Sequence, residues 1–175
     1  MGWGSCAAKP AAAYHGMMPL IGVISDTHGL LRPEALDALA GSDLIIHAGD
    51  VGGPEILDRL EAIAPVRVVR GNTDYGAFGA ALPRTEAVEL GPGGPIAWVV
   101  HDIADLDLDP AAAGFAAVVY GHSHRPSAEE REGVLYLNPG SAGPRRFDLP
   151  VTVARLELSD DGALTPRLVH LDVGR

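Results

Sequence analysis

The sequence predicts a single α/β domain with a parallel sheet in its first half and a strand-rich second half. The length of 175 residues suits one domain, and a hydrophobic content of 47% is enough to form a sizeable core. In the first half, short apolar runs rich in β-branched residues alternate with amphipathic helical patterns. This alternation is typical of strands and helices that build a parallel sheet.

The first half is expected to contain three strands that alternate along the chain with two helices. The expected elements, in order, are a strand at Leu20–Ile24, a helix that opens at Pro33-Glu34 and closes at Gly41, a strand at Leu44–His47, a helix that starts at Gly53-Pro54, and a strand at Val66–Val69. Proline at the first helical position and glycine after the last one are typical helix boundaries.

The second half contains a hairpin and further strands. Its expected elements are strands at Thr85–Leu90 and Ile96–Val100 joined by a Gly/Pro-rich turn, a short helix capped by Asp109-Pro110 and running through Phe115, and strands at Ala117–Tyr120, Val134–Leu137, Val151–Leu158 and Ala163–Leu171. We find no internal repeat and no linker.

Composition excludes several classes of protein. Acidic residues outnumber basic ones 23 to 13, so a module that grips nucleic acid through its phosphates is not expected. The single cysteine, Cys6, cannot form a disulfide framework or a thiolate zinc site. No apolar run reaches the roughly 18 residues that a membrane-spanning helix needs. We expect a cytoplasmic protein with residues 1–17 as an N-terminal tail or alternative-start extension and residues 18–175 as the domain.

Polar residues gather directly after the predicted strands, where loops of an α/β sheet converge on one crevice. These segments are Asp26-Thr27-His28, Gly49-Asp50, Gly71-Asn72-Thr73-Asp74, His101 and Gly121-His122-Ser123-His124. The pairs Asp26/His28 and His122/His124 are each separated by one residue, so in extended backbone both members point the same way. Carboxylates and imidazoles without sulfur suit Mn²⁺, Fe or Zn²⁺. Each segment alone is a common turn or cap, but the joint pattern predicts a divalent-metal site.

In this order, the motifs resemble the calcineurin-like metallophosphoesterase superfamily. The short chain, Gly-Asn-Thr-Asp and Asn138-Pro139-Gly140-Ser141 are similar to its small prokaryotic phosphodiesterase branch. The resemblance implies a four-layer α/β/β/α sandwich of two mixed sheets flanked by helices, with a binuclear metal centre. It assigns Asp26, His28 and His124 to one ion, Asn72, His101 and His122 to the other, and Asp50 to both.

The resemblance also implies a reaction. Two divalent ions would share a hydroxide that attacks a phosphoester, with Asp50, Asn72 and His101 acting through it and no side-chain nucleophile. Mn²⁺ is the ion we expect first, with Fe, Zn²⁺ or Ni²⁺ as alternatives. The expected activity is a phosphodiesterase that hydrolyses small phosphoesters. A non-catalytic protein-binding module of the same fold, similar to the retromer sorting subunit, and a phosphomonoesterase or nuclease remain alternatives.

Two positions depart from the wider superfamily pattern. Thr73 stands where many members carry a histidine that protonates the leaving group, which favours diesters with good leaving groups over alkyl monoesters. Asp102-Ile103 follows His101 where Gly-His is common, and Asp102 could orient a metal-bound imidazole or a water. Arg145 and Arg146 are candidates for pairing with a substrate phosphate, although surface or structural salt bridging is the more common role of such residues.

Overall fold

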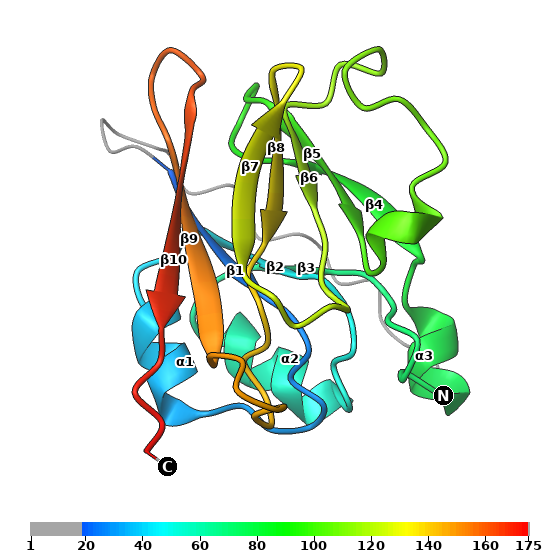
Figure 1. Ribbon diagram of the computed structural model, residues 1–175, viewed down its shortest axis with the longest axis vertical. Helices are drawn as coiled ribbons and strands as arrows, with labels where there is room; N and C mark the ends of the chain where they lie inside the picture. Colours follow the sequence, from blue (N-terminus) through cyan, green and yellow to red (C-terminus); the bar gives the residue numbers. More distant parts are fainter. Residues whose placement is uncertain (1–18, 175) are drawn as a thin grey trace.

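The computed structural model describes residues 19–174, so the expected tail at 1–17 lies outside the described residues. Two five-stranded mixed sheets face each other (Figure 1). Sheet A contains, in spatial order, β10 (Leu164–His170), β9 (Thr152–Leu158), β1 (Leu20–Ile24), β2 (Leu44–His47) and β3 (Val66–Val68). Sheet B contains β4 (Thr85–Glu89), β5 (Ile96–Val100), β6 (Ala117–Val119), β8 (Val134–Asn138) and β7 (Ser127–Arg131).

The first half forms the parallel part of sheet A, as the sequence predicts. β1 pairs in parallel with β2, and β2 pairs in parallel with β3. Helices α1 (Pro33–Leu39) and α2 (Pro54–Glu61) make the two connections, and each begins with proline, whose missing N–H costs a helix nothing at that position. The antiparallel strands β9 and β10 then extend the sheet beyond β1.

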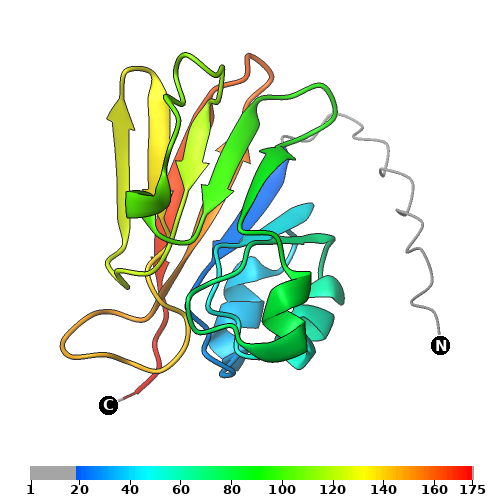
Figure 2. The same cartoon turned by 90° about the vertical axis from the view of Figure 1, so that its right-hand side faces the viewer.

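The core lies in two main layers. Side chains such as Val23 and Ile46 of sheet A meet Val99 and Val119 of sheet B in the cluster between the sheets. A second cluster fills the space between sheet A and helices α1 and α2. Figure 2 shows the helices gathered on the side of sheet A that faces away from sheet B. Burial on both faces explains why β1 and β2 are continuous apolar runs.

The outer face of sheet B is covered more thinly. Val118 and Val134 pack there against Ile103 of the short 3₁₀ helix η1 (Ile103–Asp105) and against Trp98. The ring centres of Trp98 and Phe115 lie 5.2 Å apart. The expected α/β/β/α arrangement is confirmed, with a fourth layer made of one 3₁₀ helix and turns.

Three local features differ from the sequence-based expectation. The helix expected from Asp109 to Phe115 is wrong: the segment folds into turns that end at Gly114, which has a φ of 80°. Asp109 still caps it by accepting a hydrogen bond from the Ala112 N–H at 3.1 Å. Strand β7 and helix α3 (Gly76–Ala81) are present in the structure but are not among the elements expected from the sequence. Among residues 19–174, no helix has the length and hydropathy to cross a bilayer.

Candidate metal centre

Asp26 lies at the centre of the site, directly after β1, and is fully buried. Its Oδ2 accepts hydrogen bonds from the Ser25 hydroxyl at 2.7 Å and from the His122 backbone N–H at 3.1 Å. Its Oδ1 accepts none from the residues that the structure describes. A buried carboxylate oxygen without a hydrogen-bond partner is unfavourable, so this atom is suited to bind a ligand from outside the chain.

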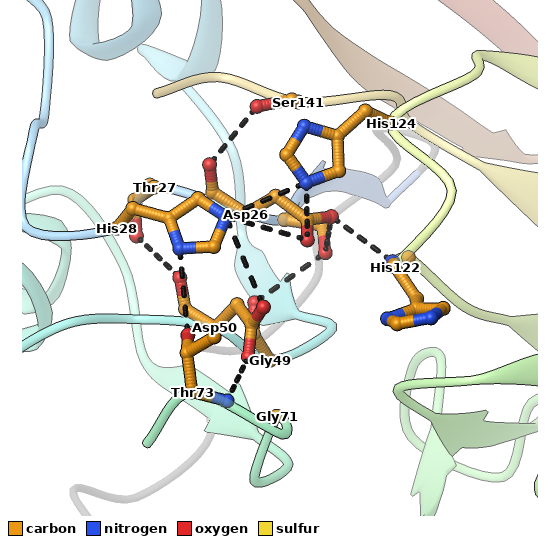
Figure 3. Close-up of polar contacts among 12 residues, drawn as sticks. Asp26, Thr27, His28, Gly49, Asp50, Gly71, Thr73, His122, His124 and Ser141 are labelled. Atoms are coloured by element: carbon orange, nitrogen blue, oxygen red, sulfur yellow. Dashed lines mark hydrogen bonds and ion pairs between the residues drawn. The ribbon is translucent and has the colours of Figure 1, made fainter. Parts of the chain in front are cut away.

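Two imidazoles face this free oxygen. The Nε2 atoms of His28 and His124 lie 3.9 and 3.2 Å from Asp26 Oδ1, and 3.4 Å from each other. Figure 3 shows the two rings and the carboxylates of Asp26 and Asp50 turned toward one another. Asp26, His28 and His124 form one group of donors that could hold a cation.

Asp50, which follows β2, lies between this group and a second one. Its Oδ2 is 3.8 Å from His28 Nε2 and 3.5 Å from His101 Nε2. Its Oδ1 accepts a hydrogen bond from the Thr73 backbone N–H at 2.8 Å. Asp26, Asp50 and His101 form a further group of possible metal donors, and all three residues are buried. The carboxylate of Asp50 therefore faces imidazoles from both sides.

Asn72 completes the second group of donors. Its side-chain oxygen lies 3.0 Å from His101 Nε2 and 3.0 Å from His122 Nδ1. His101 follows β5 and His122 follows β6 of sheet B, whereas Asn72 follows β3 of sheet A. The structure thus brings together all the residues predicted as metal ligands from five loops: Asp26, His28, Asp50, Asn72, His101, His122 and His124.

The donor set fits divalent cations. It consists of carboxylate and amide oxygens and imidazole nitrogens, which suit first-row divalent metals. The unpaired Oδ1 of Asp26 is unfavourable without a positive ion, and the two ring nitrogens, 3.4 Å apart, can both turn a lone pair to such an ion.

Hydrogen bonds and burial shift the pKa values around Asp50. Burial alone would raise the pKa of Asp50, but hydrogen bonds from His101 and the Thr73 N–H outweigh it and lower the pKa. Burial opposes protonation of His101, but its contacts with Asp50 and the Ala48 carbonyl oxygen raise its pKa. Burial lowers the pKa of His28, partly offset by Asp50 and Asp26. Asp50 is therefore held as a carboxylate, the form that binds metal.

The backbone at the site is not extended, contrary to the expectation from the Asp26/His28 and His122/His124 spacing. Asp26 and His28 do not lie on extended backbone; their φ angles are 54° and 47°. Asp50, His122 and His124 also have positive φ, at 56°, 66° and 58°. Asp and His adopt this region more often than most residues, yet it remains unfavourable. Strained backbone, rather than the alternation of a strand, aims these side chains inward.

Two glycines allow the loops to approach this closely. A Cβ on Gly71 would lie 2.1 Å from the Asp50 backbone nitrogen, and one on Gly121 would lie 2.0 Å from the Ser25 hydroxyl oxygen. Any side chain at these positions would therefore push the loops apart.

Residues 19–161 match the calcineurin-like phosphoesterase superfamily domain. The chain belongs to this superfamily. A protein of Methanothermobacter thermautotrophicus named "Probable metallophosphoesterase" is 40% identical over 149 residues, which cover 79% of this chain and 86% of the relative.

Solved structures show the same fold. A Streptococcus pneumoniae protein described as a predicted phosphoesterase has a TM-score of 0.68 and 30% identity, and the match covers 87% of this chain and 90% of that one. Vps29 of Entamoeba histolytica in complex with Zn²⁺ has a TM-score of 0.67 and 24% identity, covering 86% of this chain and 98% of Vps29. The likeness to Vps29 concerns the fold alone.

Three residues outside the predicted ligand set support the loops of this calcineurin-like chain. Asp74 is buried and accepts hydrogen bonds from the Gly52 N–H at 3.0 Å and the Gly71 N–H at 2.8 Å. The Ser141 hydroxyl donates to the Asp26 carbonyl oxygen at 3.0 Å. His47, at the end of β2, is fully buried, and its Nε2 lies 2.9 Å from the Thr27 hydroxyl oxygen.

The two candidate substrate-binding arginines differ in position. The Arg146 guanidinium lies 3.4 Å from His28 Nε2, so its side chain reaches the centre. Arg145 is exposed, and the contacts of the described residues do not connect it to the centre. Thr73 also lies at the site, with its hydroxyl oxygen 3.4 Å from His28 Nδ1.

Proposed function

We propose that this protein is a metal-dependent phosphodiesterase acting on small phosphoesters. The observation that carries the proposal is the buried Asp26 Oδ1, which lacks a hydrogen-bond partner among the described residues and faces two imidazole nitrogens beside the carboxylate of Asp50. A cation satisfies this arrangement, and membership of the superfamily supports a phosphoesterase.

In this proposal, the donors divide between two divalent ions, with Mn²⁺ as the first candidate. Asp26, His28 and His124 hold one ion; Asn72, His101 and His122 hold the other; and Asp50, which faces both groups, contributes to each. Such ions polarise phosphoryl oxygens and lower the pKa of a bound water to about 7.

The chain's own groups position the reactants. The Thr73 N–H fixes Asp50 through its Oδ1, which leaves Oδ2 free to face the imidazoles. Arg146 reaches the nitrogen that His28 turns toward the centre. Once that nitrogen is occupied by an ion, the guanidinium is available to pair with a non-bridging phosphate oxygen. The seven donors thus hold the ions, and Arg146 orients the phosphate.

Thr73 argues for diesters with good leaving groups over alkyl monoesters. A threonine hydroxyl does not protonate a leaving group as an imidazolium does, and a missing general acid costs about 10²–10⁴-fold. The reaction therefore depends on a leaving group that departs without a proton. Aryl esters meet this condition and alkyl esters do not.

The test compares bis(p-nitrophenyl) phosphate with p-nitrophenyl phosphate and an alkyl monoester in Mn²⁺-loaded protein. The diester should have the highest kcat/KM and the alkyl monoester the lowest. Asp50→Asn should abolish turnover and reduce bound Mn²⁺, whereas Asp37→Asn, an exposed position on α1 away from the site, should change neither. Full turnover by Asp50→Asn would refute the metal mechanism, and metal binding without turnover of any ester would favour a binding module.

A further inference from the structure

Three of the four imidazoles at the centre have both ring nitrogens in contact with other groups. His101 Nδ1 lies 2.7 Å from the Ala48 carbonyl oxygen, and His28 Nδ1 lies 3.4 Å from the Thr73 hydroxyl oxygen. In both rings Nε2 faces the carboxylates. A group on the outer nitrogen of a metal-binding histidine fixes the orientation and tautomer of the ring.

In His122 the two nitrogens have exchanged places, so that Nδ1 faces the other donors and Nε2 contacts the outer group. Its Nδ1 lies 3.0 Å from the Asn72 side-chain oxygen, and its Nε2 lies 3.4 Å from Asp102 Oδ2. The His122 side chain is 45% exposed, compared with 6% for His101. An exposed ring is not held by packing, so a polar contact has more influence on its orientation.

Asp102 is itself fixed in place. Its Oδ1 accepts a hydrogen bond from the Ala104 N–H at 3.0 Å and caps the 3₁₀ helix η1. This contact leaves Oδ2 directed at His122. Asp102 and Asn72 each present an acceptor oxygen to this ring, one at each nitrogen. Where the Asn72 oxygen binds a cation instead, the contact with Asp102 favours a proton on Nε2 and leaves the Nδ1 lone pair free.

We propose that Asp102 is a positioning residue that holds His122 with Nδ1 directed at the ion shared with Asn72 and His101. This role rests on the proposed function of the centre. It gives a purpose to the position at which this chain departs from the wider superfamily pattern. Asp102 acts through His122 and does not itself touch the ion.

The experiment is a double-mutant cycle on the binding of Mn²⁺ alone to the full-length protein, measured by calorimetric titration. In the wild-type background, Asp102→Ala should weaken one of the two Mn²⁺ sites by about 10–100-fold and leave the other within about threefold. Asp102→Asn, which keeps an acceptor oxygen, should recover part of the loss. In the His122→Ala background, Asp102→Ala should change Mn²⁺ affinity by less than about threefold.

Asp105→Asn is the matched control, because Asp105 is an exposed carboxylate on η1, and it should leave both sites unchanged. Equal weakening of both sites by Asp102→Ala, or the same loss in the His122→Ala background, would overturn the positioning role. Unchanged affinities in Asp102→Ala would overturn it as well. A wild-type protein that binds no Mn²⁺ would overturn the proposed function, and with it this role.

Discussion

Replacing Asp26 with asparagine should raise the free energy of unfolding of the metal-free protein and reduce the further rise that Mn²⁺ produces. Asp26 is fully buried, and its Oδ1 accepts no hydrogen bond from the described residues although His124 Nε2 lies 3.2 Å away. In Asp26→Asn, an amide nitrogen in the place of Oδ1 can donate to that ring nitrogen. The other oxygen keeps its bonds from Ser25 and the His122 N–H.

The expected change follows from these contacts. An unsatisfied buried polar group costs about 1–3 kcal/mol, so the free energy of unfolding of the metal-free variant should rise by up to that amount. With Mn²⁺ at 100 times the dissociation constant of the ion that Asp26 would hold, this one site should add about 2.7 kcal/mol to the free energy of unfolding of the wild type. In the variant, the contribution of this site should fall below about 1 kcal/mol because a neutral amide replaces a carboxylate donor, and the contribution of the second ion should remain.

Urea unfolding at pH 7.5, in EDTA and in Mn²⁺, measures both quantities. Asp37→Asn serves as the control because it removes a carboxylate from an exposed position on α1, and it should match the wild type in both buffers. If metal-free Asp26→Asn is destabilised by more than about 1 kcal/mol, the unpartnered oxygen of Asp26 does not lower the stability of the wild type. A full Mn²⁺ response in the variant would show that Asp26 binds no ion.

Three further predictions concern residues around the centre. Burial lowers the pKa of His47 to about 4, so the unfolded chain binds a proton between pH 6.5 and 4 that the folded chain does not. In EDTA, the free energy of unfolding should therefore fall by about 3 kcal/mol as the pH drops through this range, and urea titrations of His47→Gln should lack this loss. Gly121→Ala should cost about 1–3 kcal/mol in thermal unfolding and weaken Mn²⁺ binding, since its Cβ would meet the Ser25 hydroxyl. Arg146→Ala should raise the KM for bis(p-nitrophenyl) phosphate about tenfold without changing Mn²⁺ affinity, whereas the same change in Arg145→Ala would assign the effect to general charge.

The sequence predicts the parts of the fold that depend on burial. β1 and β2 are buried on both faces, and their apolar runs mark them clearly. β7 carries Ser127–Arg131 with four exposed residues at the edge of sheet B, so no apolar pattern could reveal it. Helix α3 contains two glycines and has no side-chain cap, and tertiary packing alone explains its formation.

The residues of the candidate site could be predicted from the sequence, but their arrangement in space could not. Residue type and position after strands selected Asp26 and Asp50, because parallel strands end at one edge. The contact between Asp102 and His122 joins two loops that follow different strands of sheet B, and their separation in space does not follow from sequence spacing. An Asp-x-His motif also does not predict the positive φ angles that the structure has at the site.

Five of the donor positions have left-handed backbone, which lowers the stability of the fold, although the proposed chemistry needs their side chains. At each of Asp26, His28, Asp50, His122 and His124, glycine would adopt the observed φ with less penalty. A laboratory evolution experiment that rewards heat resistance of the metal-free protein alone should therefore discard these residues early, whereas selection that requires turnover should retain them and gather its stabilising changes elsewhere.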